Sequence, residues 1–437
     1  MPIGDGEKMN KSKYPWFVFG TFFAFILFQQ TERLVIGPLT TPIMDEFQIN
    51  EAQMGLVFSA ALIVAAVLYP VWGYLYDRFA RTKLLALAAL IWGATTWLSA
   101  AVRTFPAFVL TRSSTGIADS SYPGLYNVTN DYFEPKVRGK IMGLLQIAQP
   151  LGYLMGMVLA LILGGVIGWR GVFYVTGAVG FVLAIVIFFG VKEPQRGGSE
   201  PELQGIDQKG DYKFNWKTAF GLFKKRSLIF LFLNCFAGVF PWQVITFWFF
   251  RYLQVERGYD TNTVLVIMVV AVLVLAAGFP IGGLVGDYFF KRNQRGRLLV
   301  SAAGIIIALV LMVLTINVPN NDSLLFGSLL ALTCLFMPIA APNVITTVYD
   351  MTLPEVRSTA NALQNFFEVV GSSTAPLIAG IIAVNSSLRD AILLICIVAW
   401  STCFIFISIS AYLAPKDLQD LRDQLQKRAE IEKAGTA

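Results

Sequence analysis

The segment from Phe105 to Asp131 reads FPAFVLTRSSTGIADSSYPGLYNVTND and determines much of how this chain can fold. It is long enough to cross a bilayer as a helix, yet it carries Arg112 and Asp119. Two helical turns separate these residues, so both side chains project from roughly the same face. A charge at the bilayer centre costs about 2.5–3.5 kcal/mol even on lenient insertion scales. The segment therefore predicts a helix that turns both charges toward a protein partner or a water-filled path.

The composition indicates a polytopic helical membrane protein. Of the 437 residues, 56% are hydrophobic and 14% are charged, which excludes an ordinary soluble globule. At roughly 20 residues per span, the chain has room for about twelve helices. Its basic residues are spread over many short loops, so we expect no nucleic-acid partner. The polar start runs directly into an apolar span, so we expect no cleavable signal peptide.

The chain contains no histidine and four cysteines. All four cysteines lie in apolar segments, which favours small buried side chains over disulfides or metal ligands. We therefore expect no metal site and no cofactor. Proton handling near neutral pH must then fall to carboxylates, because no imidazole is available.

Twelve apolar segments are predicted to span the membrane. They are residues 15–43, 52–76, 83–102, 105–131, 138–166, 169–191, 227–254, 262–289, 297–318, 323–350, 357–384 and 390–413. The long polar segment between the sixth and the seventh divides them into two groups of six. The predicted domains are a six-helix bundle at 1–191, a linker at 192–226, a second six-helix bundle at 227–413, and a tail at 414–437.

Lysine and arginine placement predicts the orientation. The start, the linker, the tail and alternate loops hold most of the basic residues. The opposite loops hold Arg103, Arg170, Arg251, Arg257 and Arg389. Both termini and the linker are therefore expected in the cytoplasm, with the protein in the plasma membrane.

The two halves repeat each other. The fourth span ends DYFEPKVR from Asp131 to Arg138, and the tenth ends DMTLPEVR from Asp350 to Arg357, with Asp, Pro, Val and Arg at identical spacing. Gly-x-x-x-Asp recurs after the second and eighth spans. The sequence thus predicts an all-α membrane protein of two pseudo-symmetric bundles, an arrangement that places a transport site at the midplane between repeats.

The stretch GYLYDRFARTK, from Gly73 to Lys83, resembles the signature loop of the major facilitator superfamily, with Ala80 in place of a common glycine. The weaker copy GGLVGDYFFKR has Tyr288 where an arginine is usual. In that family the loop closes the cytoplasmic side by charge pairing; the alternative is that these residues are positive-inside anchors. The gate residues that the resemblance and the repeat imply are Gly73, Asp77, Arg78, Arg81, Asp131, Arg138, Asp287, Asp350 and Arg357.

Further motifs narrow the resemblance. The first span contains QQTERLVIGPL with adjacent Glu32 and Arg33, the fourth contains GIADSSY from Gly116, and the fifth contains AQPLG from Ala148. This series is similar to the spinster-type lipid transporters, and less closely to the anion:cation symporters. In spinster-like proteins an acid–arginine pair in the first helix and a glutamate in the fourth are implicated in proton coupling. The resemblance places Glu32–Arg33 and Asp119 in these roles, with Glu and Asp exchanged relative to the usual pattern.

The first and fourth spans together bring two acids and two bases to membrane depth. A mutually paired cluster would offset much of the burial cost. If a proton neutralises Glu32 or Asp119, then Arg33 or Arg112 is released and can bind an anionic substrate group. The alternative is a static ion-pair lattice that fixes helix packing.

In the second half, Glu368 is the mid-span charge. It is a candidate second proton or cation site, with pairing to a tyrosine or a backbone group as the alternative. The candidate substrate-binding residues are Arg33, Arg112, Tyr122, Asn127, Gln146, Trp242, Gln243, Asn343 and Asn365. The polar ones are also typical of bridges between packed helices, and the aromatics of the seventh span are typical of an interfacial belt.

These features predict a secondary transporter that works by alternating access, is coupled to protons, and moves a lipid-like amphipathic or small organic anion. The alternatives are a sugar-acid or other carboxylate symporter, a drug efflux antiporter, and a receptor or scaffold. An enzyme or an ATP-driven pump is disfavoured, since the chain lacks clustered nucleophiles and a Gly-x-x-x-x-Gly-Lys loop. We expect a monomer whose partners are its substrate, protons and lipids.

Overall fold

The computed structural model describes residues 5–121, 123–133, 135–194, 222, 225–352 and 357–435. Within these ranges, the side chains of 5–12, 77, 123, 127, 130, 135–140, 357–359 and 424–435 are not described. The chain divides into two units, residues 1–211 with 246–251, and residues 212–245 with 252–437. The regular secondary structure of the described residues in both units is helical.

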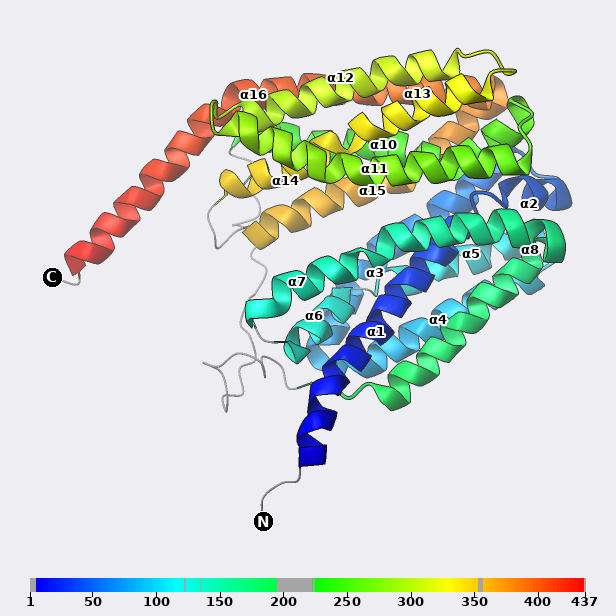
Figure 1. Cartoon of the computed structure of the whole chain (residues 1–437), viewed down its shortest axis with the longest axis horizontal. Coiled ribbons are helices and arrows are strands. Elements are labelled where there is room, and N and C mark those ends of the chain that lie inside the picture. Colours follow the sequence, from blue (N-terminus) through cyan, green and yellow to red (C-terminus); the bar gives the residue numbers. More distant parts are fainter. Residues whose placement is uncertain are drawn as a thin grey trace. The chain divides into compact units, whose positions relative to one another are not determined.

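The first unit contains eight described helices (Figure 1). They are α1 (Asp5–Val35), α2 (Thr40–Phe47), α3 (Glu51–Arg78), α4 (Arg81–Ala101), α5 (Phe105–Asp119), α6 (Pro123–Tyr132), α7 (Pro135–Gln146) and α8 (Ala148–Gly190). Within α8, Gly168 has φ 68° and ψ 168°, a conformation that glycine adopts without strain. The chain therefore turns back at Gly168. The fifth predicted span is formed by α7 and the first part of α8, and the sixth by the rest of α8.

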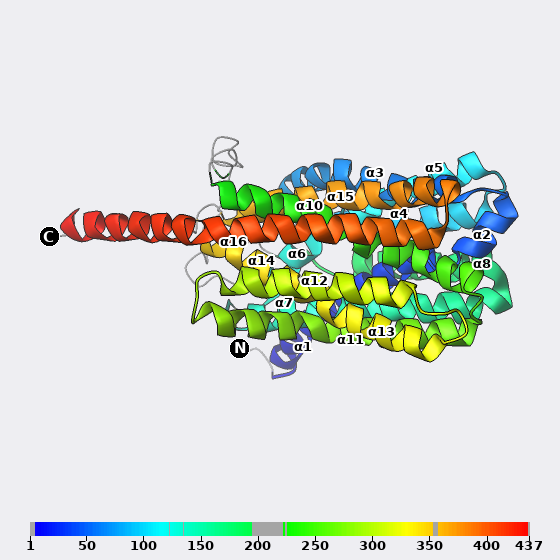
Figure 2. The ribbon, with the colours of Figure 1, turned by 90° about the horizontal axis from the view of Figure 1, so that it is seen from above.

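The second unit continues with helices of similar length. They are α10 (Arg226–Arg251), a π-helical turn (Tyr252–Glu256), α11 (Thr261–Phe290), α12 (Gly296–Ile316), α13 (Ser323–Phe336), a 3-10 turn (Met337–Ile339), α14 (Ala340–Asp350), α15 (Arg357–Asn385) and α16 (Leu388–Gly435). The last predicted span and most of the predicted tail form one helix, α16, which passes through Pro415 without a break (Figure 2). Leu418 and Leu421 of that extension are buried.

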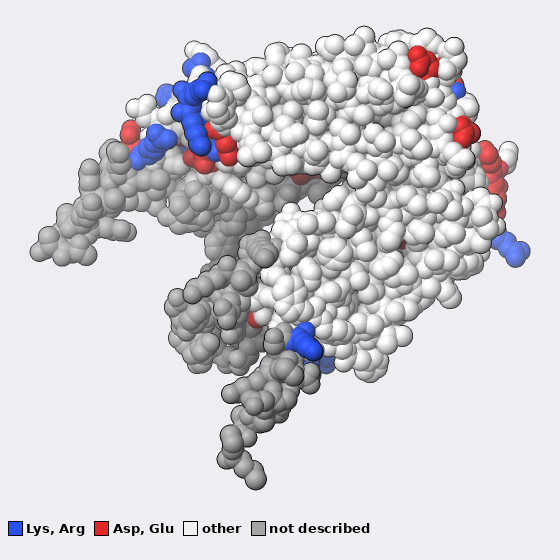
Figure 3. Space-filling model, in the orientation of Figure 1, with Lys and Arg blue, Asp and Glu red and all other residues white. Residues whose placement is uncertain are grey.

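Nine helical segments of the described residues are long and apolar enough to cross a membrane. One of them, Ile141–Gly190, contains the hairpin at Gly168, and the predicted first and fourth spans are not among the nine. On the face drawn in Figure 3, most charged side chains lie near the helix ends and the flanks are uncharged. Large apolar side chains of the helices, such as Leu324, Phe189 and Val166, are highly exposed, as expected for surfaces solvated by lipid.

The predicted continuous helix over residues 105–131 is wrong. It is interrupted after Asp119, and α6 begins at Pro123. Proline lacks an N–H and disfavours helical geometry in the preceding residue. The Ser120 and Ser121 hydroxyls donate back to the carbonyls of Gly116 and Ala118, a local competition typical of serine.

Small residues allow close packing of helices in both units. A Cβ on Gly156 of α8 would lie 2.3 Å from the Thr31 carbonyl oxygen of α1, and one on Gly152 would lie 2.4 Å from that of Leu27. In the second unit, a Cβ on Gly371 of α15 would lie 2.4 Å from the Phe236 carbonyl oxygen of α10. Close backbone approach at small residues is a main source of helix association in lipid.

We predict that Gly156→Ala lowers the stability of the purified protein, because the added methyl group forces α1 and α8 apart. Overpacking of this kind costs about 1–3 kcal/mol. Thermal unfolding in detergent measures the effect. Gly20→Ala on α1 is the matched control, since its Cβ meets nothing within 4 Å. Equal melting temperatures for the two variants would contradict the packing argument.

Candidate functional site

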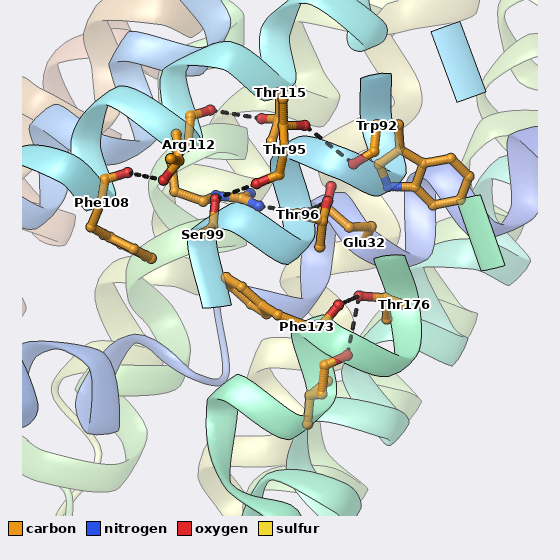
Figure 4. Close-up of polar contacts among 12 residues, drawn as sticks. Glu32, Trp92, Thr95, Thr96, Ser99, Phe108, Arg112, Thr115, Phe173 and Thr176 are labelled. Carbon is orange, nitrogen blue, oxygen red and sulfur yellow. Dashed lines mark hydrogen bonds and ion pairs between the residues drawn. The ribbon is translucent and has the colours of Figure 1, made fainter. Parts of the chain in front are cut away.

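The centre of the first unit is an ion pair between Glu32 of α1 and Arg112 of α5 (Figure 4). Both residues are buried, with 1% and 5% of their surfaces exposed. The Thr96 hydroxyl of α4 donates to Glu32 Oε1 at 3.5 Å. The guanidinium carbon of Arg112 lies 5.2 Å from the ring centre of Phe173 on α8. Four helices thus enclose one pair of opposite charges.

The surroundings of this pair are polar but internally satisfied. The hydroxyls of Thr95, Ser99 and Thr115 donate to carbonyls of their own helices, as the dashed lines of Figure 4 show for these side chains. They therefore raise the local polarity without competing for the carboxylate. A buried ion pair needs such satisfied neighbours, because its desolvation cost can exceed its attraction.

All four charges predicted at membrane depth line one small cavity of the first unit. Its volume is about 20 Å³, room for about one water molecule. The charged lining residues are Glu32, Arg33, Arg112 and Asp119. Apolar side chains, including Ile36, Val57 and Leu62, form most of the rest. The cavity therefore combines two acids, two bases and an apolar wall.

Several buried side-chain atoms on the helices of this cavity make no hydrogen bond. Among the described side chains, the buried Arg112 Nε, Gln29 Oε1 and Gln30 Oε1 have no hydrogen-bond partner. Gln29 Nε2 donates to the Ala118 carbonyl oxygen at 3.2 Å. Buried polar atoms without partners are uncommon in folded proteins, and here they lie on the helices that carry the four charges.

The break after α5 is stabilised by side chains from α3. Trp72 Nε1 donates to the Ile117 carbonyl oxygen at 2.7 Å, and the Tyr76 hydroxyl donates to that of Ser121 at 2.6 Å. A helix interruption at membrane depth frees backbone carbonyls, which must be satisfied by protein. These bonds fix the end of α5, where Asp119 stands.

Residues 246–251 of α10 pack within the first unit. The rings of Phe58 and Phe247 stack with centroids 4.5 Å apart, and both side chains line the cavity. One turn beyond, Arg251 Nη2 lies 3.0 Å from Glu51 Oε1 at the start of α3. The aromatic stack closes one side of the cavity.

The other predicted substrate-binding residues do not join this cavity. Gln146 and Asn365 are exposed, Trp242 is half-buried and Gln243 is buried. Asn343 Nδ2 donates to the carbonyl oxygens of Gly282 and Ile339, both at 2.9 Å, so its amide bridges α11 and the turn before α14. Tyr122 and the side chain of Asn127 lie outside the described residues.

Equivalent arginine clamps stand in the two units. Arg81 at the start of α4 binds Asp131 at the end of α6, with Nη1 and Oδ2 2.7 Å apart. Arg297 at the start of α12 pairs with Asp350 at the end of α14 and lies 2.7 Å from Asp287. The repeat that the sequence displays thus recurs as a repeated contact. Of the other predicted gate residues, Gly73 and Arg78 are exposed, and the side chains of Asp77, Arg138 and Arg357 are not described.

Two members of these clamps were not among the predicted site residues. Arg297 stands in the sequence only as one of several loop bases, and Glu193 as part of Lys192-Glu193-Pro194. Glu193 Oε1 lies 2.9 Å from Arg81 Nε, and its Oε2 accepts from the Thr82 backbone N–H at 2.8 Å. Burial alone would raise the pKa of Glu193, but the hydrogen bonds from Thr82 and Arg81 outweigh it and lower that pKa below its usual value.

Among the described side chains, no three His, Cys, Asp or Glu residues lie close enough together to hold a metal ion. Neither the cavity nor the clamps therefore offers an acidic metal centre within that part of the chain.

A family profile and several known proteins are similar to this chain in sequence. The profile of the Major Facilitator Superfamily matches residues 18–376. The protein "Protein spinster" of Drosophila melanogaster is 25% identical over 84% of this chain and 62% of its own length. The "Probable L-galactonate transporter" of Escherichia coli is 25% identical over 86% and 84%. The "Sphingosine-1-phosphate transporter SPNS2" of Xenopus tropicalis is 25% identical over 80% and 70%.

A solved structure gives the same fold. A bacterial homolog of the human lysosomal transporter spinster, crystallised in an inward-facing and unoccupied conformation, superposes with a TM-score of 0.82. It is 18% identical and covers 92% of this chain and 98% of its own. At this identity the likeness concerns the fold, a twelve-helix arrangement of two six-helix bundles.

We predict that Glu32→Gln and Arg112→Met each destabilise the protein by about 3–5 kcal/mol, because each leaves one buried charge unpaired. The double variant is expected to recover most of this loss, since it leaves no charge behind. Thermal unfolding of the three purified proteins measures the coupling. A double variant that loses the sum of the two single losses would show that the pair is not coupled.

The variant Glu193→Gln tests how the Glu193 charge in the Arg81 clamp affects the pH dependence of stability. A carboxylate whose pKa is lower in the folded state stabilises above its unfolded pKa of about 4.3, and this contribution disappears as pH falls through the folded value. The wild type is therefore expected to have a larger free energy of unfolding than the variant at neutral pH, and a higher melting temperature. The difference should be no more than about 1 kcal/mol, because the Glu193 side chain is 30% exposed. The difference should vanish near the folded pKa; a constant difference at all pH values would mean that the charge is not involved.

Proposed function

This chain belongs to the major facilitator superfamily, and on that premise we propose that it moves an amphipathic or small organic anion in exchange for, or together with, protons. It is a multi-pass membrane transporter and not an enzyme. The observation that carries the finer proposal is the Glu32–Arg112 pair inside a cavity that Asp119 and Arg33 also line. The two domains proposed for alternating access are 1–191 and 227–413, joined by 192–226.

The proposed coupling is a competition for arginine. With Glu32 ionised, Arg112 is bound to the carboxylate and is unavailable to an anion. A proton on the carboxylate removes its charge, so the guanidinium then offers its N–H donors to a carboxylate, sulfonate or phosphate group. Release of the anion restores the pair and favours loss of the proton. Proton and substrate are thereby linked through one side chain.

Asp119 and Arg33 are proposed to be the second acid and base of this exchange. They line the same cavity as the central pair, and Asp119 stands at the end of α5, where side chains of α3 hold the backbone. Asp119 is therefore the carboxylate proposed to accept a proton that leaves Glu32. Glu368 of α15 is proposed as a further ion-coupling carboxylate, in the second unit.

A lipid-like anion is the favoured substrate. The cavity wall is largely apolar, with Ile36, Val57, Phe58, Leu62 and Phe247 beside the charges. A site of this composition suits a molecule with an anionic group on an apolar body. The name of a relative, a sphingosine-1-phosphate transporter, agrees with this class. The L-galactonate and hexuronate transporters among the relatives favour a sugar acid as the second candidate.

The arginine clamps are proposed to be the cytoplasmic gate. Each clamp joins the starts and ends of helices within one unit, so its rupture would free helix ends to move. Gly73, Asp77, Arg78, Arg138 and Arg357 remain proposed members of the gate. We also propose that the protein acts as a monomer in the plasma membrane with both termini in the cytoplasm.

The coupling proposal predicts that Glu32→Gln and Asp119→Asn abolish uptake driven by a pH gradient while counterflow exchange continues, because the amide cannot cycle a proton. The measurement is uptake into proteoliposomes, with the substrate first chosen by thermal-shift screening of lysolipids against sugar acids. Asp45→Asn, an exposed carboxylate on α2, is the matched control and should transport normally. Concentrative uptake in both cavity variants would remove the proposal; absence of counterflow with any ligand would favour a receptor or scaffold.

A further inference from the structure

The two units differ in how they treat a carboxylate at membrane depth, which is buried for Glu32 and half-buried for Glu368. In the first unit Glu32 is neutralised by Arg112. In the second unit, no lysine or arginine among the described side chains forms an ion pair with Glu368 of α15. Its neighbours are neutral: Gln364 Nε2 donates to Glu368 Oε1 at 3.3 Å, and the Cys235 thiol of α10 hydrogen-bonds to the same carboxyl group. A positive partner stabilises a carboxylate at membrane depth.

The same two helices, α10 and α15, carry unused side-chain oxygen atoms. Gln364 Oε1 and Asn234 Oδ1 are buried and have no hydrogen-bond partner, in residues that are 3% and 7% exposed. Asn234 directly precedes Cys235, and the Cys235 thiol contacts both Gln364 and Glu368. A buried acceptor without a donor is unfavourable. Two such acceptors on the helices that hold a carboxylate without a basic partner make a set of oxygen atoms that suits a positively charged species.

The backbone of α10 supplies one more oxygen. Pro241 lies inside the helix and has no N–H, so the Ala237 carbonyl lacks the donor that a regular helix would provide. Ala237 follows Phe236, whose carbonyl oxygen would lie 2.4 Å from a Cβ on Gly371, and Gly371 is one turn beyond Glu368. Carbonyls released where a membrane helix is interrupted are typical ligands of coupling cations in transporters.

We infer that Glu368, Gln364, Asn234 and the Ala237 carbonyl bind a monovalent metal cation between α10 and α15. One carboxylate and several neutral oxygens balance a single positive charge, whereas divalent ions usually recruit more carboxylates. A proton would satisfy at most one of the unused acceptors, but a metal ion can contact all of them. When the side-chain amide of Gln364 is flipped, its oxygen faces the Glu368 carboxylate, and both groups can then bind the same cation. This inference identifies the class of ion that binds at the proposed Glu368 site. It rests on the transport proposal only for the role of that ion in transport.

Sodium binding to the purified full-length protein tests the inference without any transport assay. Sodium chloride is titrated against choline chloride at constant ionic strength and pH, and the melting temperature is recorded. The wild type is expected to show a saturable rise with sodium. Glu368→Gln, which keeps the shape and removes the charge, should weaken the apparent affinity by at least about tenfold. Asp45→Asn on α2, in the other unit, should respond as the wild type does.

A second variant covers the case in which Glu368→Gln does not fold. Asn234→Leu removes one proposed ligand and keeps the carboxylate, so it should weaken sodium binding while leaving the protein intact. A wild type with no saturable response to sodium, lithium or potassium would overturn the inference, and so would an unchanged response in Glu368→Gln or in a folded Asn234→Leu. Failure of proton-driven uptake would instead count against the coupling proposal and leave this result unaffected.

Discussion

The pairing of Glu32 with Arg112 is the interaction on which the first unit depends. Each side chain alone would be an ionised group in a low-dielectric interior, and together they become tolerable because their charges cancel over a single contact. Four helices have to meet around that contact, and small residues at the α1–α8 interface make the approach possible. We propose coupling at the same contact, because neutralising one partner leaves the other charge without a counterion.

The break between α5 and α6 follows from the same constraint. The helix α5 ends at Asp119, which lines the cavity. Freed carbonyls at Ile117 and Ser121 are taken up by Trp72 and Tyr76, so the irregular backbone occurs where protein, and not lipid, can satisfy it. The position of Asp119 is therefore held by hydrogen bonds from α3 and by a proline on the chain just beyond.

The duplicated halves share their clamps but not their buried charge. Arg81 with Asp131 and Arg297 with Asp350 occupy corresponding helix ends, as expected when one packing solution is used twice. The buried Glu32 of the first unit has an arginine, while the half-buried Glu368 of the second has only an amide and a thiol. The contacts that tie helix ends together are thus symmetric, and the surroundings of the two carboxylates are not.

The sequence by itself determined the membrane class, the approximate places of the spans and the internal repeat, because these depend on apolar length and on short local spacing. It also identified the charges that needed an explanation, Glu32, Arg33, Arg112 and Asp119. It did not reveal which of them pair, nor that Arg297 and Glu193 complete the clamps, because residues far apart in the chain meet only when the helices pack. The turn at Gly168 falls between the predicted spans 138–166 and 169–191. The break before Pro123 was not predicted, since the segment 105–131 is long enough to form one continuous span. Only the tertiary structure decided the pairing and the break: partner choice is set by the closeness and rotation of neighbouring helices, which no local pattern encodes.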